Sequence, residues 1–394
     1  MVTVSGTSEA LRIVHVITKG DVGGAQTHVV ELATTQKQLG AAVHVVAGCD
    51  GPALERLREN GVATSVVPSL AAAWSGGSKR AAIGDLRIEL RGLAPDVVHG
   101  HSSHAGLFSR LAARSLGVPS VYTAHGWPFQ AGAPWRQRLS SFLGESAGAW
   151  VGDAVICLTA AEAERARVVV PRRRLWIVPN GIRDVAVGEV RPIGRSSDGP
   201  VRLVMVARFA PPKRQLDLVR ALNAVADASW TLTFVGDGPD LDVCRDEAER
   251  LFPDGRVRFE GHRDDVPSLL AEHDVAVLWS GYEGMPMALL EGMRAGLCCV
   301  ANDLPGVRAL FDTEARAGDG AEGAGRIVTD GAELAAAVAG WCDDRAELDR
   351  LGVAARARYL EAFTASEMVA ATARVYAAAI ARRRFIGPRR ARGA

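Results

Sequence analysis

Short apolar runs rich in valine and isoleucine alternate with amphipathic stretches along the first half of the chain. Runs of this length predict buried strands, whereas apolar residues at helical spacing predict helices. Strands that alternate with helices in this way are typical of a doubly wound parallel sheet. The predicted strands are Leu11–Ile17, Val43–Ala47, Thr64–Val67, Asp96–His99, Ser120–Thr123, Ala154–Leu158 and Trp176–Val178, with helices such as Gln26–Leu39, Ala53–Asn60, Ala105–Leu116 and Ala160–Val168 between them.

The pattern stops at residues 184–200 and then begins again. This segment is rich in Gly, Pro, Ser and Asp and lacks periodicity, which is typical of a linker. Since a chain of 394 residues exceeds what one core usually holds, two domains are expected. The strands predicted after the linker are Val201–Val206, Thr231–Val235, Arg256–Phe259, Val275–Trp279, Leu297–Ala301 and Arg326–Val328.

We therefore predict an α/β protein made of two tandem Rossmann-like, doubly wound domains. The N-terminal domain comprises residues 1–183 and the C-terminal domain residues 201–364, joined by the linker 184–200. Ligands of open parallel sheets bind beyond the carboxyl ends of the strands. The binding site is therefore expected in an interdomain cleft, where two such sheet edges face each other.

The composition is that of a soluble globular protein. Nearly half of the residues are apolar (48%) and the net charge is only +1, which argues against a nucleic-acid-binding protein. No apolar stretch reaches the ~18–20 residues of a membrane-spanning helix, and residues 1–10 do not have the pattern of a secretory signal. The six cysteines form no C-x-x-C pair and are expected to be reduced and mostly buried, in a cytoplasmic protein: Cys49, Cys157, Cys244, Cys298, Cys299 and Cys342.

Two glutamates eight positions apart, Glu283 and Glu291, carry the clearest chemical signal. An apolar run, Asp274–Trp279, precedes them and predicts a buried strand, and the pattern turns helical beyond Pro286. Proline suits the first helical turn, where a missing N–H costs nothing. Glu283 is therefore predicted on the loop between strand and helix, with Glu291 about one turn into the helix.

The start of this helix is a predicted anion site. The amides of Met287, Ala288 and Leu289 would point out of the helix N-terminus, which attracts phosphate. A carboxylate beside an anion site suits a ligand that carries hydroxyls as well as phosphate, as a sugar nucleotide does. Two solvated glutamates on a helix are the alternative interpretation of the bare spacing.

Two cations, Arg208 and Lys213, follow the first strand of the C-terminal domain in the segment VARFAPPKRQ. Cations at the carboxyl end of a parallel strand can bind a diphosphate. Solvated surface residues are the alternative, but the predicted position opposite the Glu283 loop favours the diphosphate. Arg214 is expected to point to solvent.

Glycines follow the first strand of the N-terminal domain, in the segment Gly20–Gly24, just before a helix predicted to start near Ala25. Glycine there allows the backbone to approach a ligand at a helix N-terminus, although a tight turn explains the segment equally well. The segment is not G-x-G-x-x-G, and no acidic residue stands in a clear ribose-binding position at the end of the second strand. Both absences argue against an NAD-dependent dehydrogenase.

His125 lies just beyond the strand Ser120–Thr123 and would face the predicted cleft. A structural role is the alternative, since the chain has nine histidines and three others, His99, His101 and His104, crowd another strand end. No group of His, Cys and carboxylate residues has metal-ligand spacing. The D-x-D sequence at Asp240–Asp242 is better explained by the start of a helix. No metal or cofactor is therefore expected.

Taken in order, these segments resemble the GT-B glycosyltransferases, specifically the large retaining family 4 with its E-x7-E signature. The resemblance extends from about residue 11 to residue 363. Each motif alone is weak, but the ordered set is specific. The set consists of the Gly23-Gly24 loop, His125, Val178–Gly181, Arg208 with Lys213, Gly236–Pro239, Gly261–Asp264 and Glu283 with Glu291.

The resemblance implies roles for these residues. Arg208 and Lys213 would stabilise the leaving nucleoside diphosphate, and Glu283 would hold hydroxyls of the transferred sugar. Glu291 would bind the ribose, and His125 would lie by the reacting carbon. The donor site would also include Gly23, Gly24, Gly236, His262, Arg263, Gly284, Met285, Pro286, Met287, Ala288 and Leu289.

The family implies transfer of a sugar from a nucleotide-diphosphate donor, with a leaning to UDP, to an acceptor hydroxyl with retention. The amino-acid sequences of Ser280–Leu290 and Ala124–Trp127 are similar to those of enzymes of capsule and exopolysaccharide assembly. One departure is Arg214, where the family often has glycine. A UDP-sugar 2-epimerase of the same two-domain plan and a non-catalytic sugar-nucleotide-binding module remain alternatives.

The segment Glu367–Arg384 predicts a helix, and in this fold the last helix crosses back onto the first domain. Arginines crowd the final residues, beginning within this segment. They form either a solvated tail or a surface attracted to anionic lipid, worth ~1 kcal/mol per residue near a membrane. The second interpretation would suit a lipid-linked acceptor and a peripheral position at the inner face of the membrane. These arginines are Arg382, Arg383, Arg384, Arg389, Arg390 and Arg392.

Overall fold

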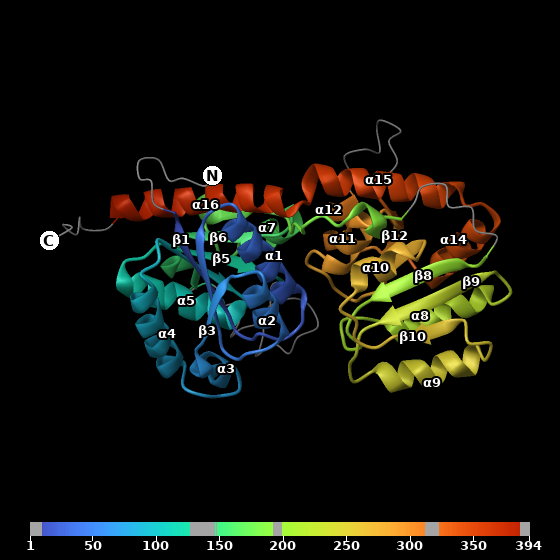
Figure 1. Cartoon of the computed structure of the whole chain (residues 1–394), viewed down its shortest axis with the longest axis horizontal. Helices are drawn as coiled ribbons and strands as arrows, with labels where there is room; N and C mark the ends of the chain where they lie inside the picture. The colour runs from blue at the N-terminus through green and yellow to red at the C-terminus, as the bar shows by residue number, and fades with distance from the viewer. Residues whose placement is uncertain (1–9, 127–145, 147, 192–198, 312–322, 387–394) are drawn as a thin grey trace. The chain divides into compact units, whose positions relative to one another are not determined.

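The computed structural model describes residues 10–126, 146, 148–191, 199–311 and 323–386. The chain divides into two compact units (Figure 1). Unit 1 comprises Met1–Arg183 together with Ala365–Ala394, and unit 2 comprises Asp184–Thr364. Among the described residues, no helix has both the length and the apolar character needed to cross a bilayer.

Unit 1 is built on a seven-stranded parallel sheet with the strand order β3-β2-β1-β4-β5-β6-β7. The order reverses direction between β1 and β4, as in a doubly wound fold. All seven strands agree with the predicted ones to within two residues. They are β1 (Arg12–Ile17), β2 (Ala42–Ala47), β3 (Ala63–Val66), β4 (Val97–His101), β5 (Ser120–Ala124), β6 (Ala154–Cys157) and β7 (Leu175–Ile177).

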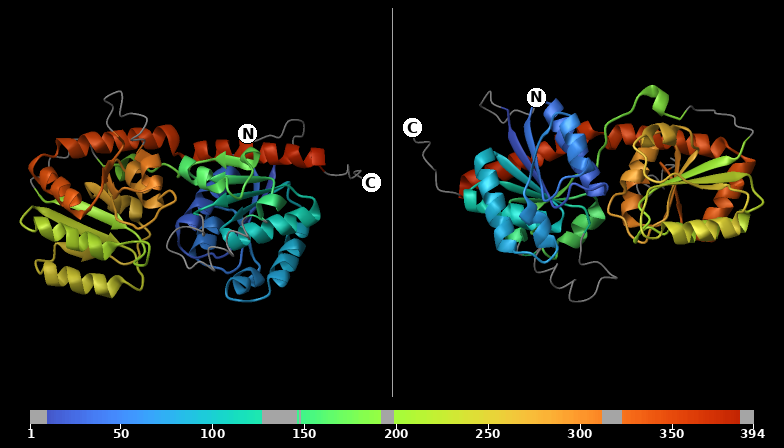
Figure 2. Two further views of the ribbon diagram at one scale, coloured as in Figure 1. Left: turned by 180° about the vertical axis from the view of Figure 1, so that it is seen from behind. Right: turned by 60° about the horizontal axis from the view of Figure 1, so that its bottom comes forward.

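Helices cover both faces of this sheet (Figure 2). One core cluster packs strand residues against α1, α2 and α16, and includes Leu54 and Val375. A second cluster packs the opposite face against α3, α4 and α5, and includes Leu86 and Phe108. The helices are α1 (Gly24–Gln38), α2 (Pro52–Glu59), α3 (Pro68–Trp74), α4 (Lys79–Leu93), α5 (Ser103–Leu116), α7 (Ala160–Ala166) and α16 (Ala365–Ile386).

The helix α16 comes from the end of the chain but belongs to unit 1. The amide of Ala365 donates to the carbonyl of Ile182 (2.9 Å), so the helix begins where the first segment of unit 1 ends. Met368, Val369 and Tyr376 then enter the same core cluster as α1. This arrangement is the one that we predicted, in which the last helix returns to the first domain.

Unit 2 contains a six-stranded parallel sheet with the order β10-β9-β8-β11-β12-β13, again within one residue of the predicted strands. Its strands are β8 (Val201–Val206), β9 (Trp230–Val235), β10 (Val257–Phe259), β11 (Val275–Leu278), β12 (Cys298–Asn302) and β13 (Arg326–Val328). Its helices are α8 (Gln215–Leu222), α9 (Leu241–Leu251), α10 (Val266–Ala271), α11 (Met287–Arg294), α12 (Pro305–Phe311), α14 (Gly331–Asp343) and α15 (Ala346–Ala362).

A buried carboxylate fixes the start of β11. Asp274 is 1% exposed and accepts hydrogen bonds from the side chains of Arg191 (3.4 Å) and Arg202 (2.9 and 3.0 Å). The side chain of Arg191 is only 2% exposed and also pairs with Asp349 (2.7 Å). Since Arg191 belongs to the segment that we predicted as a linker, part of that segment is anchored in unit 2.

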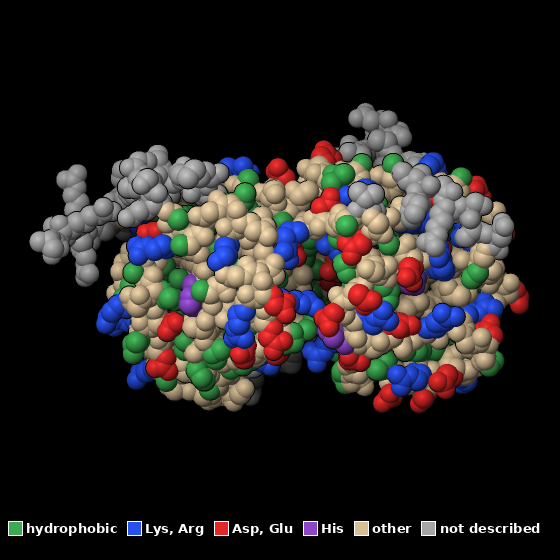
Figure 3. Space-filling model, in the orientation of Figure 1, with side chains coloured by type: hydrophobic (Ala, Val, Ile, Leu, Met, Phe, Trp, Pro, Cys, Tyr) green, Lys and Arg blue, Asp and Glu red, His purple; other side chains and the backbone are tan. Residues whose placement is uncertain are grey.

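The state of the cysteines and the distribution of surface charge agree with what the composition predicted. All six cysteines are free thiols, and four of them are buried. Burial raises the pKa of Cys157 and of Cys244 to about 12, so these thiols stay protonated at neutral pH. Basic and acidic side chains are interspersed over the face drawn in Figure 3, as expected for a net charge of +1.

Candidate active site

The first half of the candidate donor site follows β8. Arg208 is exposed there, and its guanidinium has no ion-pair partner among the residues described. The neighbouring β9 loop approaches so closely that a Cβ on Gly236 would lie 2.3 Å from the carbonyl oxygen of Ala207. Gly236 also has φ of +134°, which favours glycine. Gly236 is therefore required for the two loops to pack together.

The loop after β8 is joined to the loop after β11 by backbone contacts. Lys213 and Ser280 form an antiparallel bridge. The amide of Gly281 donates to the carbonyl of Pro212 (2.7 Å), and the amide of Arg214 donates to the carbonyl of Trp279 (3.0 Å). These bonds hold Lys213 beside the segment that carries Glu283.

Lys213 and Glu283 are in direct contact as an ion pair. Their side chains are 20% and 11% exposed, so the pair is largely removed from solvent. The sequence had placed the two residues on opposite parts of one ligand, and their direct pairing was not predicted. Each charge is therefore balanced by the other.

The Glu283 loop is held in place by two further residues, which the sequence did not indicate. Asn302, at the end of β12, accepts from the amide of Ser280 (2.9 Å) and donates to its carbonyl (2.8 Å). A Cβ on Gly306 would lie 2.2 Å from the carbonyl oxygen of Gly284, so this glycine lets α12 approach the loop. The signal for Asn302 was a polar residue ending an apolar strand, and Gly306 gave no signal.

The helix α11 begins at Met287, one residue later than the position predicted for the first turn. Pro286 is the N-cap, with extended backbone (φ −72°, ψ 119°), rather than the first helical residue. The amides of Met287, Ala288 and Leu289 still form the first turn, where amides lack helical acceptors. Glu291 is half-buried about one turn further along.

Among the other predicted donor residues of unit 2, His262 is exposed and Arg263 half-buried, and both are paired locally. The guanidinium of Arg263 bonds Asp265 (2.7 Å) and Glu260 (3.0 Å). His262 faces Asp264 at 3.6 Å. Asp240 is the N-cap of α9, as predicted, but its side chain makes no capping bond. The donor-binding roles of His262 and Arg263 stay predictions.

In unit 1, the glycine-rich segment lies at the N-terminus of α1, as predicted. The helix begins at Gly24, with Gly23 at the N-cap position, and the amide of Thr27 donates to the Gly23 carbonyl (2.9 Å). Gly23 has an extended backbone (φ 169°), which any residue can adopt. The backbone conformation at this position therefore does not require glycine.

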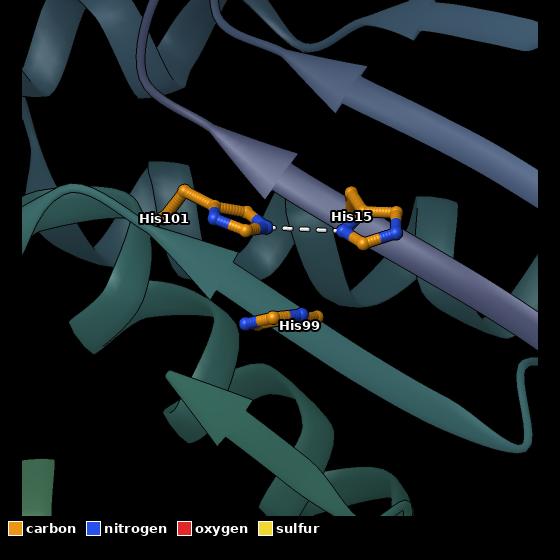
Figure 4. A group of neighbouring side chains, drawn as sticks. All are labelled: His15, His99 and His101. Atoms are coloured by element: carbon orange, nitrogen blue, oxygen red, sulfur yellow. Dashed lines mark hydrogen bonds between the residues drawn. The ribbon is translucent and has the colours of Figure 1, made fainter. Parts of the chain in front are cut away.

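His125 belongs to a group of histidines in unit 1. His15 and His99 are register partners on β1 and β4, and His101 follows two residues after His99 on the same face of the sheet. Figure 4 shows these three rings gathered together, with a hydrogen bond between His15 and His101. His125 continues the group from the end of β5.

Hydrogen bonds connect the rings into a directed chain. Nε2 of Gln36 donates to the hydroxyl of Tyr376 (3.3 Å), so Oε1 of Gln36 accepts from Nε2 of His15 (2.8 Å). In a neutral ring Nδ1 of His15 must then accept from Nε2 of His101 (3.0 Å). Nδ1 of His101 in turn accepts from Nε2 of His125 (3.2 Å).

Burial keeps these rings neutral. Desolvation lowers the pKa of His15 to about 4, although its hydrogen bond to Gln36 opposes the change. Burial also lowers the pKa of His99, His101 and His125 well below the usual value, and neighbouring histidines add to the effect. At neutral pH the cluster is therefore a polar layer without charge.

His28, on α1, completes the cluster from the helix side. Its ring centroid is 4.7 Å from that of His125. Nδ1 of His28 contacts Oδ1 of Asn180 (2.9 Å), which lies in the Val178–Gly181 segment. Spacing along the chain did not reveal this group because its members come from β1, β4, β5 and α1. The expectation of no metal rested on spacing along the chain alone and stays a prediction.

Comparisons with known proteins cover both units. The model of Glycosyltransferase Family 4 matches residues 22–184, and the model of Glycosyl transferases group 1 matches residues 200–344. The UDP-Gal:alpha-D-GlcNAc-diphosphoundecaprenol alpha-1,3-galactosyltransferase of Escherichia coli is 30% identical over 56% of this chain and 60% of that protein. EpsF of Bacillus subtilis, described as a glycosyltransferase, is 26% identical over 75% of this chain and 80% of that protein.

Solved structures share the fold. HepE from Anabaena, solved with UDP and glucose, has a TM-score of 0.76 at 18% identity, covering 92% of this chain and 98% of that one. Sucrose-phosphate synthase from Thermosynechococcus elongatus has a TM-score of 0.75 at 17% identity, covering 95% and 99%. With family models matching both Rossmann-like units, the chain belongs to the GT-B glycosyltransferases of the family 4 type.

Proposed function

We propose that this glycosyltransferase moves a sugar from a UDP-sugar to an acceptor hydroxyl, with retention, in the assembly of a cell-surface polysaccharide or glycolipid. The observation that carries the proposal is the convergence of Arg208, Lys213, Glu283 and the start of α11 at one edge of the unit 2 sheet. This edge offers positive charge, a carboxylate and free amides together. A nucleotide sugar requires all three.

Catalysis follows from the charge that the reaction creates. Breaking the anomeric C–O bond produces an oxocarbenium-like sugar and a nucleoside diphosphate with added negative charge. Arg208, Lys213 and the first amides of α11 would stabilise that charge without a metal. Residues that stabilise the transition state in this way accelerate the chemical step itself.

A bound donor would change the Lys213–Glu283 ion pair. A bound diphosphate would share or replace the carboxylate on Lys213, which releases oxygen atoms of Glu283 to accept from sugar hydroxyls. The pair thus keeps both side chains in place before the donor arrives. Glu291 would hold the ribose and His125 would lie beside the transferred sugar, as the family pattern implies.

Relatives guide the choice of substrates. The Escherichia coli relative is named for a UDP-galactose donor and a diphosphoundecaprenol-linked acceptor, and HepE was solved with UDP. We therefore propose a UDP-sugar donor and a sugar or lipid-linked sugar acceptor. A UDP-sugar 2-epimerase is disfavoured because the relatives named here are transferases or are described as such.

A lipid-linked acceptor would place the enzyme at a membrane surface, and unit 1 carries a suitable patch. Trp150 is 73% exposed, and its carbonyl accepts from Arg174 (3.2 Å). Arg172 and Arg173, which precede Arg174 in the chain, are exposed. Arg383 is not part of a free tail, since it pairs with buried Asp153 (2.8 Å). The predicted basic residues Arg389, Arg390 and Arg392 lie outside the described residues.

The proposal is tested by assaying a panel of nucleotide sugars with lipid-linked and simple sugar acceptors. A product with an α-linkage from an α-linked donor, identified by NMR, would establish transfer with retention. An epimerised sugar released without any acceptor would instead establish the epimerase. Arg208→Ala should lower kcat by about 100-fold, while Arg220→Ala, which removes an exposed arginine paired with Glu247, serves as the matched control.

A further inference from the structure

The buried histidine cluster contains two groups that could hold a metal ion. One ring nitrogen from each of His15, His99 and His101 lies within 4.8 Å of the others, and the same holds for His28, His101 and His125. These are the groups found among the described residues. Imidazole nitrogens suit zinc, copper, nickel and iron, so either group has appropriate chemistry.

The first group is already satisfied by hydrogen bonds. Nδ1 of His99 bonds the hydroxyl of Tyr376 (2.7 Å), and Nε2 of His99 bonds the hydroxyl of Thr123 (2.7 Å). His15 likewise uses both nitrogens, on Gln36 and His101. A metal there would have to break several buried hydrogen bonds, each costly to lose.

The second group has an unused nitrogen. His28 is 2% exposed, and its Nε2 is buried with no hydrogen-bond partner among the described residues. Because Oδ1 of Asn180 accepts from Nδ1 of His28, that Nε2 carries a lone pair. A buried lone pair without a donor needs explanation, since buried polar atoms almost always have partners.

We propose that His28, His101 and His125 form a site for a divalent transition metal ion, with Zn²⁺ as the ion of first choice. The ligands are Nε2 of His28, Nδ1 of His101 and Nε2 of His125. The last two nitrogens are 3.2 Å apart, close to the ~3.3 Å between two nitrogens that each lie ~2.0–2.1 Å from a tetrahedral zinc ion.

The outer contacts are those of a metal site. A ligating histidine usually donates its other ring N–H to a carboxylate, carbonyl or other acceptor, which fixes the tautomer. His28 donates to Asn180, and His101 donates to His15, which is itself fixed by Gln36. For His125 to bind, its proton moves from Nε2 to Nδ1, so the neutral ring keeps its proton count.

Three protein ligands leave a fourth position for water or another ligand, as in catalytic rather than structural zinc sites. His125 is only half-buried, whereas His28 and His101 are buried, so an ion would reach the site past His125. An ion bound to Nε2 of His125 and a donor sugar that uses the same nitrogen would exclude each other.

The test is metal binding by the full chain without an affinity tag. After dialysis against a chelator, Zn²⁺ is titrated in competition with a chromophoric chelator, and Co²⁺ is titrated in parallel. We expect one equivalent to bind, a tetrahedral Co²⁺ spectrum without sulfur charge-transfer bands, and three imidazole nitrogens at about 2.0 Å by zinc X-ray absorption. The absorption measurement uses the unaltered chain and so does not depend on a variant that folds.

The variant His28→Gln keeps a side chain that can bond Asn180 but removes the ligand. It should weaken Zn²⁺ binding by about 100-fold or more, beyond the roughly 10–100-fold that loss of an outer partner costs. His44→Gln is the control, because His44 bonds Ser65 outside the cluster. Sulfur ligands in the absorption spectrum, no stoichiometric binding, or equal affinity in His28→Gln and the unaltered chain would each overturn the proposal, whatever the transferase activity shows.

Discussion

The contact between Lys213 and Glu283 allows the proposed division of labour to be tested by a double-mutant cycle. The single variants are Lys213→Met and Glu283→Gln, and the double variant combines them. In the free enzyme the two side chains act on each other. In the proposed transition state they act on different parts of the donor, the diphosphate and the sugar. Stability and catalysis should therefore give different coupling.

The magnitudes follow from burial. With side chains 20% and 11% exposed, the pair lies between exposed pairs, worth about 0.2–1 kcal/mol, and fully buried pairs, whose breakage costs about 3–5 kcal/mol. We expect each single variant to lose about 1–2 kcal/mol of unfolding free energy and the double variant to lose little more. A loss of that size lowers the Tm of a domain of this size by roughly 2–8 °C.

The effects of the same variants on kcat should differ from their effects on stability. Each single variant should lower kcat by about 100-fold, since each removes a contact to charge that develops in the transition state. The losses in the double variant should multiply, because the two contacts are independent once the donor is bound. Effects on separate groups are additive in free energy, whereas effects within one contact are not.

The assay is kcat at saturating donor for the four proteins, with thermal melts alongside. The exposed pair Arg214–Asp217, with side chains 53% and 40% exposed, supplies the control cycle and should change neither quantity much. A double variant with the same kcat as either single variant would refute the reasoning. Lys213 and Glu283 would then matter only by positioning each other.

Three further outcomes are expected. Glu291→Gln should mainly raise the KM for the donor and leave kcat nearly unchanged, because a ribose contact is similar in ground and transition states; steady-state kinetics decide this. Transfer should persist after exhaustive chelation, since Arg208 and Lys213 are proposed to supply the positive charge at the diphosphate; complete loss with rescue by added metal would contradict it. Asp274→Asn should destabilise unit 2 by about 3–5 kcal/mol, because it leaves the buried Arg191 without one of its carboxylates, and denaturant unfolding measures this.

The strands could be predicted from sequence because buried parallel strands are short apolar runs bounded by loops, a local signal. The end of β8 was predicted for the same reason, and the start of α11 was predicted from the change to helical spacing beyond Pro286. The N-cap position of Pro286 shows the usual limit of one residue at a helix boundary.

Contacts between side chains of different strands and helices could not be predicted from the sequence. The sequence placed His99 and His101 near one strand end, but it did not indicate that His15, His28 and His125 would lie beside them. Which rings gather depends on strand order and register, and β1 neighbours β4 through a long crossover. The pairing of Lys213 with Glu283 likewise depends on β8 and β11 being adjacent.

The position of α16 sets an order in which the protein can be made. Unit 1 needs Met368, Val369 and Tyr376 to complete its core, but these residues are synthesised after all of Asp184–Thr364. At about 5–20 residues per second, the 181 residues in between take roughly 10–40 s. Unit 2 is continuous in sequence and can fold first. The first 183 residues must therefore wait on the ribosome with one face of their sheet incompletely covered, which makes this interval the one in which a chaperone would matter most.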